Sequence, residues 1–150
     1  MRALAGTFVY AGSSERGRIM IDRAIELATE DMGFLRESIA SDRLQEKTAI
    51  AQRIVIARDK NMVTVEFQGV TYRSRINGVW VTATSPAGES IRVRHRIRGD
   101  KLVQEIRAKK GRRVNLFRAR GKDRLDVEAI ISSPHLPEDV RYDLRYRRVE

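Results

Sequence analysis

The feature that most constrains this chain is an alternation of apolar and polar side chains that recurs through most of its length after residue 51. The clearest case is segment 89–99 (ESIRVRHRIRG), in which four arginines alternate with Ile91, Val93, His95 and Ile97. Successive side chains of a β-strand point to opposite faces, so one face here is mostly apolar and the other carries guanidinium groups. The apolar face must be covered, while the charged face must meet water or an anion. The recurrence of the pattern predicts one curved sheet whose apolar face points inward.

We expect ten strands, one near the N-terminus and nine after residue 47. Their approximate ranges are 4–11, 52–58, 62–68, 70–76, 79–84, 89–98, 101–108, 112–119, 124–132 and 140–148. The strongest turn signal is Asn77-Gly78, because both residues tolerate the positive φ of a tight hairpin. The short connections make neighbouring strands antiparallel, and such a meander with one buried face closes most economically into a barrel. An open sheet packed on helices is the alternative, although two helices could hardly cover so many strands.

The segment between the first two strands has helical periodicity instead. Ser13 and Ser14 can cap a helix that we expect to run to about Met32, with Gly33 ending it in a left-handed conformation. A second helix is expected from residue 34 to about residue 45. The predicted fold class is therefore mainly β: a ten-stranded antiparallel up-and-down barrel with a helix-turn-helix lid, about residues 14–46, between strands 1 and 2. A single domain should span residues 1–150.

Positive charge is concentrated outside the helical segment. The net charge is +10, yet residues 14–47 hold six basic and eight acidic residues, a balance of −2, so the rest of the chain carries +12. A field of this sign attracts nucleic acid, anionic membranes or acidic ligands. The simplest interpretation is a soluble, Arg-rich exterior.

The compartment is only weakly constrained by the sequence. The chain has no cysteine, no apolar run as long as a membrane span and no intact signal peptide. These features favour the cytoplasm, although a mature exported chain given a new start would look the same. We expect a monomer.

Four short motifs, in this order along the chain, resemble those of the fatty-acid-binding proteins, which belong with the lipocalins to the calycin group. Residues 4–8 (LAGTF) are similar to the F-x-G-x-W opening of that family, with Phe8 where Trp is usual. The stretch 59–65 resembles its second hairpin, 99–104 (GDKLVQ) its G-x-K-L-V-Q stretch, and 121–125 (GKDRL) its later D-G-K-L hairpin. The order of strand, helix–turn–helix and nine further strands matches as well.

The resemblance implies a small, non-enzymatic lipid carrier that holds one or two hydrophobic molecules inside the barrel beneath a helical lid. Members of the family commonly hold a ligand carboxylate with an Arg on the eighth strand and an R-x-Y pair on the tenth. The first corresponds to Arg118, and the Tyr of the pair corresponds to Tyr146. The Arg of the pair is missing, because Leu144 stands in its place. A neutral or differently oriented ligand is therefore an alternative to a fatty acid.

Several polar side chains fall on the faces that the alternation predicts to be inward. On the last strand, Tyr142 and Tyr146 offer apolar rings with a hydroxyl at the tip, suited to a ligand head group or to ordinary core packing. His95 and Gln104 share apolar faces of their own strands. Neither would be tolerated inside without a partner, so we expect a water-filled or ligand-filled cavity beside both.

The remaining candidates are open to two interpretations each. Arg118 points inward, and then needs an anion, if it shares the face of Val114 and Leu116; it is a surface residue if the strand is shifted by one residue. Trp80 lines the cavity or packs at its rim, and Met32 touches a ligand from the lid or packs in the core. The full set of candidate ligand-binding residues is Arg118, Tyr146, Tyr142, His95, Gln104, Met32 and Trp80.

The sequence contains no convincing catalytic or metal-binding set, so we expect neither an enzyme nor a cofactor. The favoured function is binding or transport of a fatty acid or another small hydrophobic or amphipathic ligand. The Arg-rich exterior leaves two other partners open, an anionic membrane surface and nucleic acid, although it lacks the interleaved aromatic residues that stack on single strands. A third alternative is a haem-binding barrel with one histidine as the axial ligand.

Overall fold

The computed structural model describes residues 4–33, 40, 42–45, 47–85 and 87–149. The named elements are β1 (Gly6–Tyr10), α1 (Ser14–Thr29), β2 (Arg53–Asp59), β3 (Met62–Phe67), β4 (Val70–Arg75), β5 (Val81–Thr84), β6 (Ser90–Arg98), β7 (Lys101–Ala108), β8 (Gly111–Arg120), β9 (Arg124–Ser132) and β10 (Val140–Arg148). The ten strands match the predicted ranges closely, because alternation along a half-buried strand is a direct signal of its extent.

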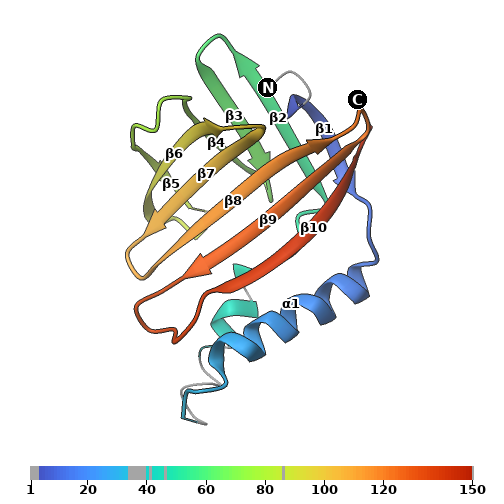
Figure 1. The fold of residues 1–150 in the computed structure, drawn as a ribbon. Coiled ribbons are helices and arrows are strands. Elements are labelled where there is room, and N and C mark those ends of the chain that lie inside the picture. Colours follow the sequence, from blue (N-terminus) through green and yellow to red (C-terminus); the bar gives the residue numbers. More distant parts are fainter. Residues whose placement is uncertain (1–3, 34–39, 41, 46, 86, 150) are drawn as a thin grey trace.

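The strands form one antiparallel sheet in the order β4-β3-β2-β1-β10-β9-β8-β7-β6-β5. The first and last strands pair with each other, with Phe8 opposite Arg148 and Tyr10 opposite Tyr146. The sheet curls into a nearly closed barrel, and α1 crosses one end of it (Figure 1). The predicted mainly-β, up-and-down barrel is therefore confirmed.

The predicted hairpin at Asn77-Gly78 is wrong, because β4 and β5 are the two unpaired edges of the sheet. Gly78 does adopt positive φ (+74°), but its N–H donates to the carbonyl of His95 on β6 at 3.0 Å. Ile76 also forms an isolated bridge with His95, and the Ser74 side chain reaches the same residue. We call these three contacts of Ser74, Ile76 and Gly78 with His95 the seam, since they join β4 to β6 across the opening. Pairing with a distant strand has replaced the locally favoured hairpin.

Helix α1 begins as predicted and ends earlier than predicted. The Oγ of Ser13 accepts the N–H of Arg16 at 3.3 Å, which caps the first turn. The helix ends at Thr29 rather than Met32, and Gly33 is not among the glycines with positive φ. The last turn has no basic residue, and Glu30 and Asp31 follow it. Two negative side chains therefore lie at the negative end of the helix dipole, which disfavours continuation of the helix.

The apolar face of α1 closes the end of the barrel. Ile21, Ile25 and Ala28 are each at most 2 % exposed, and the helix packs against β10. Gly17 permits this close approach, because a Cβ there would lie 2.8 Å from Ile50 and closer still to the hydroxyl of Tyr10. We call this the helical end of the barrel.

A short second helical segment follows on the same side of the molecule. Residues 40, 42–45 and 47 are helical, and Leu44 is buried as expected. Most of the predicted second helix, residues 34–39, 41 and 46, lies outside the described residues. Among the described residues, no helix is long and apolar enough to cross a membrane.

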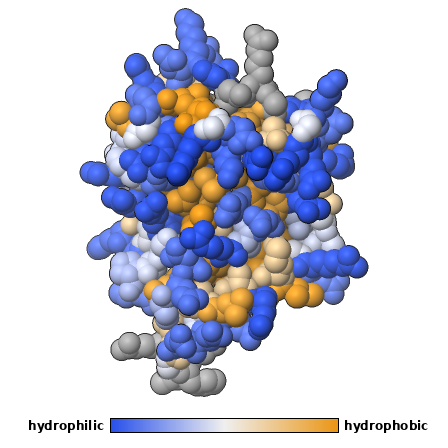
Figure 2. All heavy atoms as spheres, viewed as in Figure 1, coloured by the Kyte–Doolittle hydropathy of each residue, from blue (hydrophilic) through white to orange (hydrophobic). Residues whose placement is uncertain are grey.

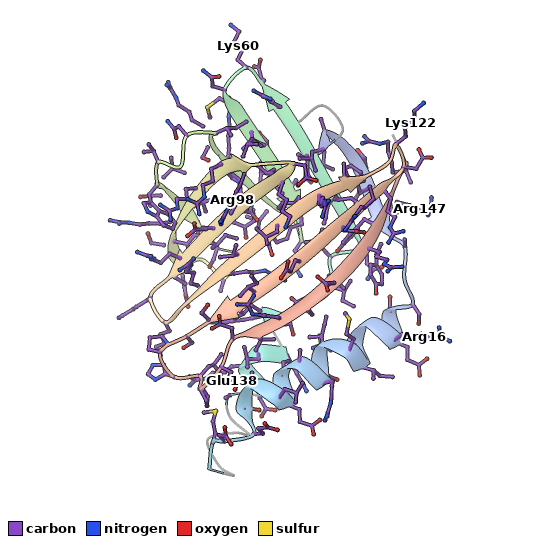
Figure 3. The ribbon with its side chains drawn as sticks, in the orientation of Figure 1. Arg16, Lys60, Arg98, Lys122, Glu138 and Arg147 are labelled. Atoms are coloured by element: carbon purple, nitrogen blue, oxygen red, sulfur yellow. The ribbon has the colours of Figure 1, made fainter. Side chains whose placement is uncertain are left out.

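Large side chains are buried inside the barrel in the described part of the chain. The largest fully buried ones include Phe8, Phe117, Leu102, Leu125 and Tyr146, each at most 1 % exposed. A ligand that bound among these side chains would have to displace some of them. The outer wall is different: Figure 2 shows mostly hydrophilic side chains with apolar surface between them, and Lys60, Lys122 and Arg147 project away from the barrel (Figure 3).

Candidate ligand-binding site

A continuous chain of hydrogen bonds runs across the inner wall from β8 to β4. Three of its members lie directly opposite one another in neighbouring strands: His95 on β6, Gln104 on β7 and Asn115 on β8. The Nε of Arg113 meets Asn115 Oδ1 at 2.9 Å, Asn115 Nδ2 meets Gln104 Oε1 at 2.9 Å, and Gln104 Nε2 meets His95 Nε2 at 3.1 Å. His95 Nδ1 then lies 2.6 Å from Ser74 Oγ. We call these five residues the polar chain.

The donor at one end determines the direction of every bond in the polar chain. A guanidinium can only donate, so the oxygen of Asn115 must accept from Arg113 and its amide nitrogen must donate to Gln104. Gln104 in turn donates to His95 Nε2, which leaves the ring proton on Nδ1, facing Ser74. The Ser74 hydroxyl donates onward to the carbonyl of Arg75 at 3.1 Å. Bonds aligned in this way polarise one another, and each buried group is satisfied.

His95 is therefore a neutral, fully occupied core residue. Burial lowers the pKa of its imidazole from 6.5 to about 4. His95 and Gln104 are both 0 % exposed, and each is hydrogen-bonded to neighbouring side chains, so a cavity is not needed to satisfy either of them. Since both ring nitrogens are already hydrogen-bonded, His95 has no free nitrogen for a haem iron.

Arg113 also ties the inner wall to the segment that covers the helical end. Its Nη1 donates to the carbonyl of Lys47 at 3.1 Å. On β10, the hydroxyl of Tyr146 donates to the carbonyl of Ala51 at 2.7 Å. Segment 47–51 is thus held by the barrel wall at Lys47 and Ala51, and Arg18 of α1 and Gln68 also hold it, at Thr48 and Ala49.

All four tyrosines of the chain gather around this region. The rings of Tyr10 and Tyr146 meet edge to face at 5.7 Å. Burial raises the pKa of Tyr146, and the nearby guanidinium of Arg113 acts in the opposite direction, while Tyr142 and Tyr10 add to the rise. Burial likewise raises the pKa of Tyr72, again opposed by Arg113. The guanidinium of Arg113 therefore lies near enough to Tyr72 and Tyr146 to act on both phenols.

Tyr142 differs from the other buried polar residues of the inner wall. Its side chain is 4 % exposed, and its hydroxyl has no hydrogen-bond partner among the described residues. A buried hydroxyl without a partner costs roughly 1–3 kcal/mol, so native proteins rarely leave one. The group is therefore available to a bound molecule.

Comparison with solved structures gives consistent results over the whole chain. Fatty-acid-binding protein 1 of Echinococcus granulosus aligns with a TM-score of 0.58 at 13 % identity, covering 100 % of each chain. The zebrafish ileal bile acid-binding protein in complex with cholic acid gives 0.58 at 14 %, covering 98 % of this chain and 99 % of that one. The fluorescent protein UnaG gives 0.61 at 15 %, covering 97 % and 96 %. This chain has the fatty-acid-binding-protein-like calycin fold. No protein-family model and no curated protein matches it.

Within this fold, the predicted inward residues of β6, β7 and β10 do point inward. Tyr142, Tyr146, His95 and Gln104 are each at most 4 % exposed. Their contact with a ligand stays a prediction. Met32 is half-buried just beyond the end of α1, where its N–H donates to the carbonyl of Thr29 at 3.0 Å.

Arg118 and Trp80 lie on the outside of the barrel. Phe117 occupies the inner face of β8 at 1 % exposure, so Arg118 points outward, where its Nε pairs with Asp100 at 2.8 Å. Of the two registers that the sequence left open, β8 adopts the one that buries the large aromatic ring. Trp80 lies under two outer-face guanidinium groups, 4.2 Å from Arg94 and 5.0 Å from Arg107, and not in the interior.

The inward arginine of β8 is Arg113, which sequence reasoning missed together with Asn115, Ser74 and Tyr72. The available signal was the spacing of Arg113, Asn115 and Phe117, which places them on one face. Among the described residues, no group of three or more His, Cys, Asp or Glu side chains could hold a metal ion.

Proposed function

We propose that this protein binds, without catalysing a reaction, one small amphipathic molecule with an anionic head group at the helical end of the barrel. The observation that carries the proposal is the combination of a guanidinium, Arg113, with the unpartnered hydroxyl of Tyr142 on the same inner wall. Both lie near enough to Tyr146 to affect its pKa. A cation beside buried phenol donors suits a carboxylate, and the surrounding apolar core suits a hydrocarbon tail.

The likeness to fatty-acid-binding and bile acid-binding proteins supports this class of ligand. Those proteins are named for binding amphipathic carboxylic acids, and fatty acids are the first class to test here. Because the identities are low, the likeness supports the general class and not a particular ligand.

Entry of a ligand requires segment 47–51 to move away from the wall. The bonds of Arg113 to Lys47 and of Tyr146 to Ala51, together with those of Arg18 to Thr48 and Gln68 to Ala49, hold it in place. A ligand carboxylate would replace the Lys47 carbonyl as the acceptor of Arg113, and a charged acceptor makes the stronger hydrogen bond. The tail would displace apolar side chains beneath Ile21 and Ile25 of α1.

The test is a comparison of a fatty acid with the fatty alcohol of the same chain length on delipidated protein. We expect saturation at one site and tighter binding of the acid by about tenfold or more, since a charge-assisted hydrogen bond contributes roughly 1.5–3 kcal/mol. The Arg113→Gln variant should bind both with equal affinity. Arg118→Gln, which removes the same charge from the outer face of the same strand, should keep the preference. If wild-type protein binds neither compound, or if Arg118→Gln alone abolishes the preference, the proposal is wrong.

A further inference from the structure

Three arginines lie side by side on the outer wall of the barrel. Arg92 on β6 is directly opposite Arg107 on β7, and Arg107 is directly opposite Arg112 on β8. All three side chains are exposed. Like charges in directly opposed positions of a sheet destabilise it. The repulsion between these guanidinium groups falls when an anion binds between them.

Two of these arginines are held in place by neighbours that do not cancel their charge. Arg107 lies over the ring of Trp80 at 5.0 Å, a contact that orients the guanidinium and leaves it cationic. Arg112 lies 3.5 Å from Glu105, but this carboxylate also pairs with Arg94 at 2.9 Å and Arg96 at 3.5 Å. One buried carboxylate therefore serves three guanidinium groups, and the wall keeps a net positive charge.

A hollow of about 250 Å³ opens beside Arg107 and Arg112. It lies between the turn joining β7 to β8 and the chain that follows β9, and its walls are Arg107, Ala108, Lys109, Gly111, Arg112, Ser132, Ser133 and Pro134. These residues supply three cations and two hydroxyl groups and no carboxylate. The Ser133 hydroxyl donates to the carbonyl of Lys110 at 2.9 Å, which fixes one wall of the hollow. We call this site the outer hollow.

We propose that the outer hollow binds a phosphate group carried by a small molecule or by a lipid head group. Guanidinium groups bind phosphate oxygens in pairs, and the ammonium group of Lys109 with the hydroxyl of Ser132 can satisfy the third oxygen. An extended single strand of nucleic acid would instead need aromatic side chains along its path, and the walls of the hollow contain none. The site is on the opposite side of the wall from Arg113 and does not depend on an interior ligand.

Trp80 is the single tryptophan of the chain and lies against Arg107, so its emission can report occupancy of the outer hollow. We expect inorganic pyrophosphate to change this emission saturably, and the apparent affinity to fall as salt is raised. Lys109→Gln leaves the tryptophan contact intact and should weaken binding about tenfold. Arg107→Gln alters that contact, so its loss of affinity should be measured by calorimetry instead.

The control is Arg147→Gln, which removes the same charge from β10, where the side chain projects from the barrel away from the outer hollow (Figure 3). It should bind pyrophosphate as the wild type does. Vesicles of phosphatidylcholine containing phosphatidate distinguish the two sources of phosphate. If the wild-type protein sediments with these vesicles and Lys109→Gln does not, the phosphate belongs to a lipid head group. If the protein binds pyrophosphate and does not sediment with the vesicles, the phosphate belongs to a soluble compound.

Three results would overturn the proposal. The first is that neither pyrophosphate nor the vesicles bind. The second is that Arg147→Gln weakens binding as much as Lys109→Gln does, which would mean a diffuse charge effect. The third is that the protein retains single-stranded RNA that pyrophosphate cannot displace. Each of these leaves the fatty-acid test unaffected, because that test depends on Arg113.

Discussion

Two tyrosines on the inner face of β10 differ in what their hydroxyl groups do. The hydroxyl of Tyr146 donates to the carbonyl of Ala51 at 2.7 Å, whereas that of Tyr142 has no partner among the described residues. The two rings are otherwise alike, at 1 % and 4 % exposure on the same strand. The hydroxyl of Tyr146 therefore stabilises the fold, whereas that of Tyr142 does not. For this reason we propose that the Tyr142 hydroxyl contacts the ligand.

Replacing each tyrosine by phenylalanine separates these roles. Tyr146→Phe should lower the free energy of unfolding by about 1 kcal/mol, because it removes a made hydrogen bond and leaves a carbonyl without its donor. Tyr142→Phe should leave this free energy unchanged or raise it, because it removes a buried group that has no partner. Urea denaturation of delipidated protein measures both.

The same Tyr142→Phe variant should bind fatty acid several-fold more weakly despite its undiminished stability. A variant that loses stability as Tyr146→Phe does, or one that keeps full affinity for ligand, would contradict the role assigned to Tyr142.

At the scale of elements, strands were predictable and their partners only partly so. Alternation located all ten strands, since one face of each must be buried. The short connections predicted the antiparallel neighbours correctly from β2 to β4 and from β5 to β10, and the tight turn predicted at Asn77-Gly78 was wrong. There the turn signal is local, whereas the pairing of Gly78 with His95 is a long-range contact that no local pattern encodes.

Strand β8 shows why the candidate site was only half predictable. Its two faces are Arg113, Asn115 and Phe117 on one side and Val114, Leu116 and Arg118 on the other. Each set mixes apolar and polar residues, so alternation alone does not choose between them, and a shift of one residue exchanges the two faces. Tyr142, His95 and Gln104 were placed correctly because the residues around them on the same face are clearly apolar.

The seam between β4 and β6 gives a prediction at this scale. Ser74→Ala removes the only side-chain acceptor that the described residues offer to His95 Nδ1, so it leaves a buried N–H unsatisfied. We expect a loss of roughly 1–3 kcal/mol in the free energy of unfolding. Ser90→Ala, at an exposed position on β6, should change it by less than about 0.5 kcal/mol. Equal effects of the two substitutions in urea denaturation would show that the Ser74–His95 contact of the seam does not stabilise the fold.

At the scale of the whole molecule, charge and polarity are sorted between the two faces of one wall. The outer face carries the excess of arginine that gives the chain its net charge of +10. The inner face carries the polar chain, whose members are neutral except for Arg113 at its end. The interior ligand and the phosphate group that we propose therefore bind to opposite faces of β8, through Arg113 and Arg112, which are adjacent in the sequence.

The pH dependence of global stability follows from the direction of the polar chain. A proton added to His95 Nε2 would face the amide nitrogen of Gln104, which is also a donor, and turning that amide would set it against Asn115 in the same way. The folded state therefore resists protonation down to a pKa of about 4, whereas the imidazole of the unfolded chain takes up a proton near 6.5. Above pH 6.5 both states are neutral at this residue, and the stability contribution is at its maximum.

Between pH 6.5 and about 4 only the unfolded chain gains the proton, so stability should fall as the pH falls through this window. A pKa difference of this size corresponds to a loss of about 3 kcal/mol. Urea denaturation across the window measures the loss, and the same series on His95→Gln subtracts the contribution of the carboxylates. Proton NMR of the His95 ring provides an independent check. The prediction is wrong if the His95 ring titrates near its ordinary pKa, or if the stability of His95→Gln falls as steeply as that of the wild type. Either result would mean that the polar chain accommodates a protonated His95 without loss of stability.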